Sequence, residues 1–115
     1  MLHRRHYRRV YLTELIPVFL AESTQPFGQL LNITPDGIML HTPAQVAAKT
    51  DFKLSIKLPG GWFRPKEIAF DAKSIWCQQD FDREHGYRSG FQLLNLDEKA
   101  FRYIADFIQG MAVLS

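Results

Sequence analysis

The chain has 115 residues, of which 46% are hydrophobic and 13% aromatic, and 14 Lys and Arg against 12 Asp and Glu give a formal net charge of +2. This length and composition suit one domain with a hydrophobic core and exclude a globally disordered chain. The charge is uneven, because the first nine residues hold four arginines and no acid, which leaves a mildly acidic body. The basic N-terminal segment is therefore the feature of the sequence that a functional interpretation has to explain.

The basic segment, residues 1–9, directly precedes the first expected strand, and its arginines are Arg4, Arg5, Arg8 and Arg9. Arg5 and Arg9 can converge on one small ligand if the segment turns. A guanidinium is a planar fork of donors that binds phosphate bidentately, pairs with guanine O6 and N7, and stacks on bases. The spacing therefore favours a compact ligand with phosphates and guanines. A solvated tail or a general nucleic-acid arm stays open.

The next segment, Leu15–Ala21, has the apolar run of a signal peptide, but no small-x-small cleavage site follows it. We interpret it as a strand in which Pro17 marks an edge or a bulge. No run reaches the roughly 18 apolar residues that span a bilayer. We therefore expect neither export nor membrane insertion.

Two short strands, Phe27–Ile33 and Gly37–His41, are expected around a polar turn. The Asn32 side chain can both accept from and donate to a guanine, and Thr34 offers a hydroxyl. Gly37 permits a positive φ and a close ligand approach. Taken alone, the same residues also form an ordinary Asx or Thr turn.

Strict alternation of apolar and polar residues over Asp51–Leu58 predicts a strand with one buried face. The turn Pro59-Gly60-Gly61 leads into a second strand, whose alternation slips around Ser74–Cys77 and predicts a bulge there. A polar loop over residues 79–86 precedes the returning strand Tyr87–Leu94. Short strands with turns between them favour an antiparallel barrel or sandwich.

The end of the chain changes to a helical period, with a stripe formed by Phe101, Ile104, Ile108 and Met111 and extended by Phe107. Asn95 or Asp97 can cap the start of this helix. We expect the stripe to pack on the sheet as core. Its aromatic content can also mark a homodimer surface.

Residues with reactive side chains form no catalytic or metal-binding set. The histidines, His3, His6, His41 and His85, belong to no metal-binding motif, and we interpret the single cysteine, Cys77, as a buried structural thiol. Asp80, Asp82 and Glu84 begin like a calcium loop, but the later Gly and Glu of that motif are missing, which indicates a solvated hairpin loop. We therefore expect no enzyme, no metal and no cofactor.

Two of these elements together resemble the PilZ domain. Arg5-x-x-x-Arg9 stands before a first strand, and Asn32-x-Thr34-x-x-Gly37 follows about two dozen residues later. The rest of the chain follows the course of the family through Lys73–Trp76, a polar hairpin loop, Tyr87–Phe91 and Leu94–Glu98. The resemblance covers nearly the whole chain.

The resemblance implies a mainly β fold, a six-stranded antiparallel PilZ-type β-barrel with a C-terminal α-helix, and a bacterial receptor for cyclic di-GMP. Arg5 and Arg9 would be the arginine clamp on guanine and phosphate. Asn32, Thr34 and Gly37 would hold the other side of a guanine. Thr34 departs from the Ser that is usual in the family, and its extra methyl group could crowd the ligand.

The same resemblance implies further phosphate contacts from Arg4 and Arg8. An arginine directly before the clamp favours an intercalated pair of ligands over one. Residues 1–9 would be a switch segment that orders on ligand binding, and residues 10–115 would form the barrel with its helix over 97–113.

These observations lead us to expect a stand-alone cytoplasmic receptor for cyclic di-GMP, in motility or biofilm regulation, that relays its signal to a separate protein. One alternative is a PilZ-like adaptor without nucleotide binding, in motility or pilus assembly. Another is a small barrel that binds single-stranded nucleic acid through the arginine arm and aromatics such as Trp62 and Phe63. The acidic body disfavours a long polyanion.

Overall fold

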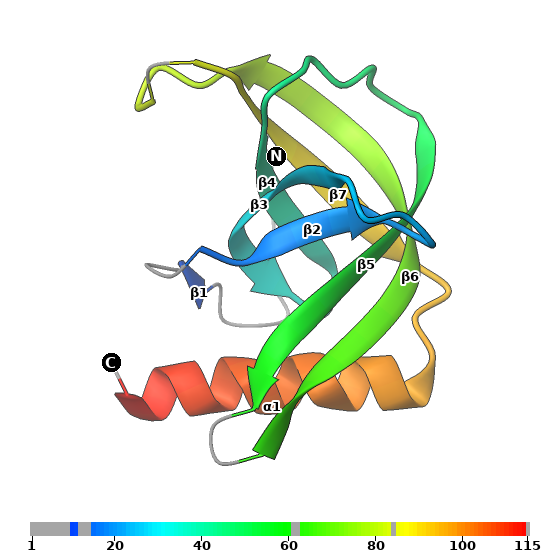
Figure 1. The fold of residues 1–115 in the computed structure, drawn as a ribbon, viewed down its shortest axis with the longest axis vertical. Coiled ribbons are helices and arrows are strands. Elements are labelled where there is room, and N and C mark those ends of the chain that lie inside the picture. Colours follow the sequence, from blue (N-terminus) through cyan, green and yellow to red (C-terminus); the bar gives the residue numbers. More distant parts are fainter. Residues whose placement is uncertain (1–9, 12–14, 61–62, 84, 115) are drawn as a thin grey trace, which may run out of the picture.

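The computed structural model describes residues 10–11, 15–60, 63–83 and 85–114, and over these ranges the chain forms seven strands and one helix. The strands curl into a closed barrel, and the helix lies across one end of it (Figure 1). The elements are β1 Val10–Tyr11, β2 Pro17–Leu20, β3 Pro26–Thr34, β4 Gly37–Thr42, β5 Asp51–Gly60, β6 Phe63–Gln79, β7 Tyr87–Leu94 and α1 Glu98–Leu114.

The barrel closes through β3 and β4. The strands follow the order β1-β3-β2-β5-β6-β7-β4, every pair is antiparallel, and β4 pairs back onto β3. Strands β2 to β7 therefore make a six-stranded antiparallel barrel with a C-terminal helix, which confirms the fold expected from the sequence. The short strand β1 is an addition that the sequence did not indicate.

Strands β1 and β2 lie along the same edge of β3. The first part of β3 pairs with β2, as in Pro17 with Gln29, whereas its end pairs with β1. Pro17 opens β2 and has no partner on β5, which suits a residue without a backbone N–H. The register between β2 and β3 shifts after Val18, so an irregularity lies in this strand, as the proline indicates.

The core fills the barrel from every strand of β2 to β7. Residues that point inward are almost without solvent exposure, for example Val18, Leu40, Leu54 and Ile56. Opposite charges face each other on the outer surface of β5 and β6, where Lys53 is opposite Asp71. Alternation of this kind fixes the register, because a slip of one residue would put charges into the core.

The bulge expected near Ser74–Cys77 is confirmed. The register between β6 and β7 shifts between Ser74 and Trp76, so Ile75 is the extra residue. This extra residue lets Ser74 point inward, fully buried, while Trp76 lies on the outer face.

The helix α1 is capped and anchored as its sequence indicates, with one exception. The Asp97 side chain accepts a hydrogen bond of 2.7 Å from the Ala100 N–H, which makes it the N-cap. Ile104 and Phe107 are buried against the barrel. Phe101 is 38% exposed, so its expected place in the core stripe is wrong. The buried stripe instead starts at Ala100, one residue earlier.

The difference between these two helix positions is measurable. Ile104→Ala removes a fully buried side chain and should lower the free energy of unfolding by about 3 kcal/mol. The matched change Phe101→Ala should cost less than about 1 kcal/mol, because this ring keeps much of its contact with water. Urea unfolding of both variants measures the difference. Equal losses would contradict the helix orientation.

Candidate functional site

The polar turn between β3 and β4 is held by Thr34. Its hydroxyl oxygen accepts hydrogen bonds from the backbone N–H groups of Asp36 and Gly37, at 3.2 and 3.1 Å, and the hydroxyl donates to the Gly37 carbonyl at 3.4 Å. Thr34 and Gly37 also pair in the register of the hairpin. The hydroxyl is therefore committed to the backbone of the turn, which it fixes in one shape.

Gly37 is needed in this turn because another strand approaches it closely. A Cβ atom at this position would lie 2.7 Å from the backbone carbonyl oxygen of Phe91 in β7. Gly37 does not have a positive φ, so the expectation of a left-handed glycine here is wrong. The glycine serves the contact between β4 and β7, and the Asp36 carbonyl adds a hydrogen bond of 3.0 Å from the Leu93 N–H.

Asn32 lies two residues before the turn, and its side chain is almost fully buried. Its side-chain amide nitrogen lies 3.8 Å from the sulfur of Met39, its partner across the hairpin. On the other edge of β3, Asn32 pairs with Tyr11 of β1. Asn32 is thus a fixed polar group between β1 and β4, next to the turn.

The pairing of β1 with β3 determines what lies beside this turn. Val10 is opposite Ile33 and Tyr11 is opposite Asn32. Val10 and Tyr11 therefore lie beside the strand that leads into the polar turn, and the arginine segment directly precedes them in the sequence. The four arginines themselves, Arg4, Arg5, Arg8 and Arg9, lie outside the described residues.

One row of residues across the outer face of the barrel leads from Asn32 to an exposed aromatic. Met39 is opposite Asn32, Gly90 is opposite Met39, and Trp76 is opposite Gly90. The Trp76 indole lies so close over Gly90 that a Cβ there would collide with it, and the ring is 38% exposed. The sequence pattern did not indicate a role for Trp76. Its position opposite Gly90 depends on the bulge at Ile75, which shifts the register of β6 against β7.

At the other end of β7, a buried carboxylate organises the hairpin between β6 and β7. The Asp80 side chain has no solvent exposure and lies 3.1 Å from both Arg83 and Arg88, and Arg88 also contacts Asp82 at 2.6 Å. The expectation that Asp80 belongs to a solvated acidic loop is therefore wrong. Glu84 lies outside the described residues.

The hydrogen bond and the two arginines around Asp80 determine its protonation state. Burial alone would raise its pKa, but the N–H of Asp82 and the charges of Arg88 and Arg83 outweigh burial and lower the pKa below 3.8. The Asp82 carboxylate raises the pKa of Arg88 in turn. Asp80 therefore stays ionised inside the hairpin and acts as its structural centre.

The His41 side chain contacts the hairpin loop between β6 and β7, because its Nε2 lies 2.8 Å from the His85 carbonyl oxygen. In the part of the chain that the structure describes, no group of three or more His, Cys, Asp and Glu residues could hold a metal ion. Within the same part, no helix has the length and apolarity that a membrane crossing requires.

Comparison with known proteins gives one family and one fold. The family model of the PilZ domain matches residues 3–110. The PilZ domain of YcgR from Escherichia coli with c-di-GMP is 19% identical and has a TM-score of 0.72, with 97% of this chain and 94% of that chain covered. No curated protein sequence matches significantly.

Two longer proteins contain the same fold. The Bacillus subtilis inhibitor of motility, MotI/DgrA, is 15% identical with a TM-score of 0.81 and 99% of this chain covered. YcgR of Escherichia coli in complex with c-di-GMP is 20% identical with a TM-score of 0.75 and 98% covered. The present chain spans about half of each, 53% and 48% of their lengths.

The close approach at Gly37 can be tested directly. Gly37→Ala puts a methyl group against the Phe91 carbonyl and should lower the free energy of unfolding by about 2 kcal/mol or more. Gly110→Ala is the matched control, since nothing lies within 4 Å of its added Cβ, and it should raise stability by about 0.8 kcal/mol through helix propensity. Thermal unfolding distinguishes the two, and a neutral Gly37→Ala would refute the close contact.

The buried carboxylate predicts a pH dependence. The pKa of Asp80 is lower in the folded chain than its value of 3.8 in the unfolded chain, so ionised Asp80 stabilises the fold. This stabilisation is fully present above pH 3.8 and is lost as the pH falls through the folded-state pKa. Asp80→Asn should therefore cost about 2 kcal/mol at neutral pH, and the difference from wild type should shrink below pH 3.8. Asp82→Asn, at a largely exposed side chain, is the control. A pH-independent difference would contradict this role of Asp80.

Proposed function

Because this chain belongs to the PilZ domain family, we propose that it is a cytoplasmic receptor that binds cyclic di-GMP without turning it over and relays the signal to a separate protein. Arg5 and Arg9 form the clamp on guanine and phosphate, and Arg4 and Arg8 add phosphate contacts. The observation that carries this proposal is the pairing of Tyr11 with Asn32. That pairing puts β1, which directly follows the arginine segment in the sequence, next to the strand that leads into the polar turn.

The chemistry of this corner suits cyclic di-GMP. The ligand offers two phosphates and two guanines in a small volume, and guanidinium groups recognise both kinds of group. Asn32 supplies an amide that can pair with a guanine edge. The proposal is supported by the two YcgR structures of the same fold, which contain c-di-GMP.

The geometry of the turn assigns different roles to its residues. The Thr34 hydroxyl is already used by the N–H groups of Asp36 and Gly37. We therefore assign Thr34 a positioning role in which it shapes the turn that the guanine meets. A Ser in its place would make the same bonds, so the methyl group of Thr34 is the only difference that the ligand could meet.

Trp76 is a further candidate for ligand contact. It follows Gly90 and Met39 in the row that starts at Asn32, and its ring is partly open to solvent. An aromatic face at the border of a guanine site offers stacking that is independent of hydrogen bonding. The arginine segment, in turn, would order over this corner when the ligand binds and so act as the switch.

Calorimetric titration with cyclic di-GMP tests the proposal. The wild-type chain should bind in the micromolar range or tighter, and Arg9→Ala should weaken binding at least tenfold because it removes a charge-assisted contact to guanine or phosphate. Arg102→Ala is the matched control, since Arg102 is an exposed arginine of α1 that contacts Glu98. The same titration gives the number of ligands bound per chain.

A wild-type chain that binds no cyclic di-GMP would overturn the receptor proposal. That outcome would favour the second candidate, a PilZ adaptor that acts through protein contacts, in keeping with the shared fold of the Bacillus subtilis inhibitor of motility. Binding that grows with oligonucleotide length and falls steeply with salt would instead favour the single-stranded nucleic-acid barrel.

A further inference from the structure

The end of the barrel remote from the polar turn carries features that the proposed nucleotide site does not use. Strand β4 runs from Gly37 in the turn to Thr42, and Thr42 pairs with Tyr87 at the start of β7. Two connections meet at this end: the segment 43–50 between β4 and β5, and the hairpin loop 80–86 between β6 and β7. The length of β4, roughly 15–20 Å, separates this end from the turn.

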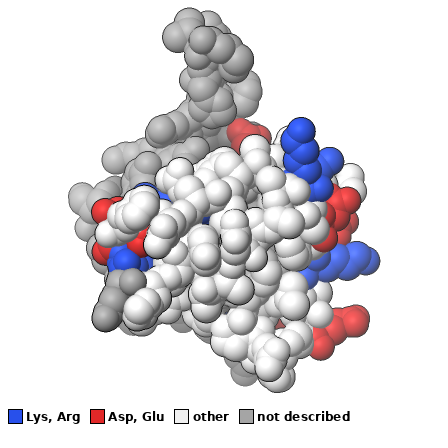
Figure 2. All heavy atoms as spheres, turned by 90° about the horizontal axis from the view of Figure 1, so that it is seen from above, with Lys and Arg blue, Asp and Glu red and all other residues white. Residues whose placement is uncertain are grey.

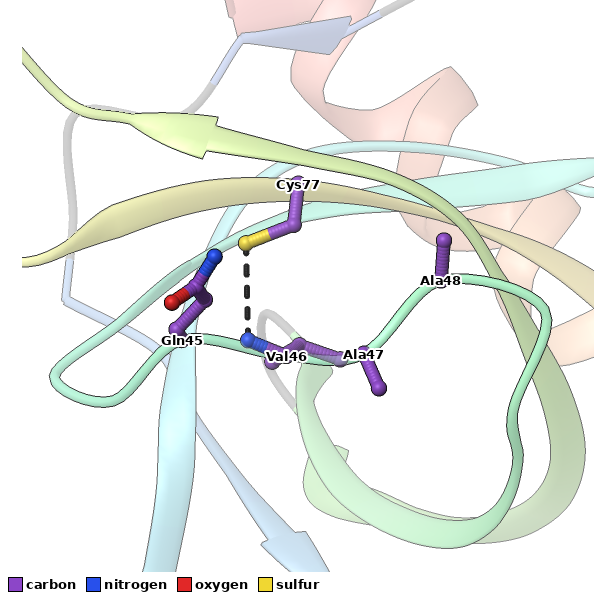
Figure 3. A pocket seen from close by; sticks show the side chains of 5 residues that line it. All are labelled: Gln45, Val46, Ala47, Ala48 and Cys77. Atoms are coloured by element: carbon purple, nitrogen blue, oxygen red, sulfur yellow. Dashed lines mark hydrogen bonds between the residues drawn. The ribbon is translucent and has the colours of Figure 1, made fainter.

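The segment 43–50 borders a hollow whose lining is mostly small or apolar, with one amide side chain. The pocket measures about 430 Å³ and is lined by Gln45, Val46, Ala47, Ala48 and Cys77 (Figure 3). The Val46 N–H lies 3.4 Å from the Cys77 sulfur, to which it donates. The buried Ser74 hydroxyl fixes the same segment through the Thr50 N–H at 3.0 Å and the Ala47 carbonyl at 2.6 Å. The hollow is therefore held in shape by the barrel.

The hairpin loop at the same end of the barrel presents a large aromatic side chain. Phe81 is 87% exposed. The loop that carries it is ordered by Asp80, whose N–H donates to the Gly86 carbonyl at 3.1 Å and whose side chain binds the Asp82 N–H and two arginines. An exposed aromatic on a preorganised loop is the kind of anchor that dominates protein interfaces, because little entropy is lost when it docks.

The surface around these two features is mostly uncharged in its middle. Figure 2 looks onto the barrel from the side of this end and shows a broad area without charged side chains, with Lys, Arg, Asp and Glu at its margins. The exposed residues of this segment include Pro43, Ala44, Gln45, Ala47 and Ala48. Depletion of charge at the centre with charges at the rim is typical of interfaces.

We propose that two copies of this chain pair through this end, with Phe81 of each copy inserted into the pocket of the other. Phe81 lies four residues beyond Cys77 along the same hairpin, so the protruding ring and the pocket belong to the same end of the barrel. A two-fold axis can then satisfy both insertions at once, as an isologous interface requires. This dimer leaves the polar turn at the other end of β4 open.

The charges at the rim favour the same arrangement. Asp82 follows Phe81 directly and its side chain is 76% exposed, while the exposed Lys49 follows Ala48 of the pocket lining. Insertion of Phe81 into the partner's pocket brings these opposite charges toward each other, twice in the symmetric dimer. Each phenyl ring buries about 150–200 Å². Two insertions make a small interface, so the dimer should be weak and should form at micromolar or higher concentration.

Disulfide trapping tests this arrangement, because Cys77 is the single native cysteine and lines the pocket. Under diamide, which oxidises two thiols to a disulfide, Asp82→Cys should give a covalent dimer, because this variant keeps Phe81 and puts a thiol next to the inserted ring. Peptide mass spectrometry should identify the bond between position 82 of one copy and Cys77 of the other. The bond should be lost in the double variant Asp82→Cys with Cys77→Ser. Leu15→Cys, at a residue 76% exposed, controls for random collision.

Sedimentation equilibrium provides the second measurement. The wild-type chain should dimerise with rising concentration, and Phe81→Ala should raise the dissociation constant at least tenfold. Phe101→Ala should leave the dissociation constant unchanged, because that exposed ring belongs to α1 at a different surface. A wild-type chain that stays monomeric up to about 1 mM, or a trapping yield for Asp82→Cys no higher than for Leu15→Cys, would overturn the proposal. Neither result depends on nucleotide binding.

Discussion

Two backbone pairs, Val10 with Ile33 and Tyr11 with Asn32, tie the N-terminal part of the chain to the strand that carries the polar turn. Strand β3 can accept this contact because β2 covers only the first part of the same edge. Strand β1 thus lies beside the strand that ends in the fixed polar turn. The proposed arginine clamp depends on this pairing, because β1 directly follows the arginine segment in the sequence.

The turn itself depends on contacts made by the closed barrel. Thr34 fixes the backbone through its hydroxyl, and Gly37 lets the Phe91 carbonyl approach without a collision. The turn is therefore held in one shape by contacts within the barrel. Under the proposed function, the arginines would bind the ligand against this preformed turn.

Much of the barrel could be predicted from local pattern. The alternation over Asp51–Leu58, the slip near Ile75 and the helical stripe with its Asp97 cap all report the immediate surroundings of each residue. The sequence failed where the details of tertiary packing decide. Packing within the β6–β7 hairpin buries Asp80 beside Arg83 and Arg88, and the pairing of β4 with β7 brings the Phe91 carbonyl against Gly37. Strand pairing also puts Trp76 in the same cross-strand row as Asn32. Contacts of this kind leave no periodic pattern in the sequence.

The central claim is that cyclic di-GMP binds at the corner where β1 meets β3. Titration of the isotopically labelled chain with cyclic di-GMP, followed by amide and indole NMR signals, tests it most directly. The largest changes should fall on residues 4–11, on Asn32–Gly37 and on the indole N–H of Trp76, while α1 and the hairpin loop 80–86 stay unchanged. Saturable changes confined to other residues, or no change at all, would contradict the claim.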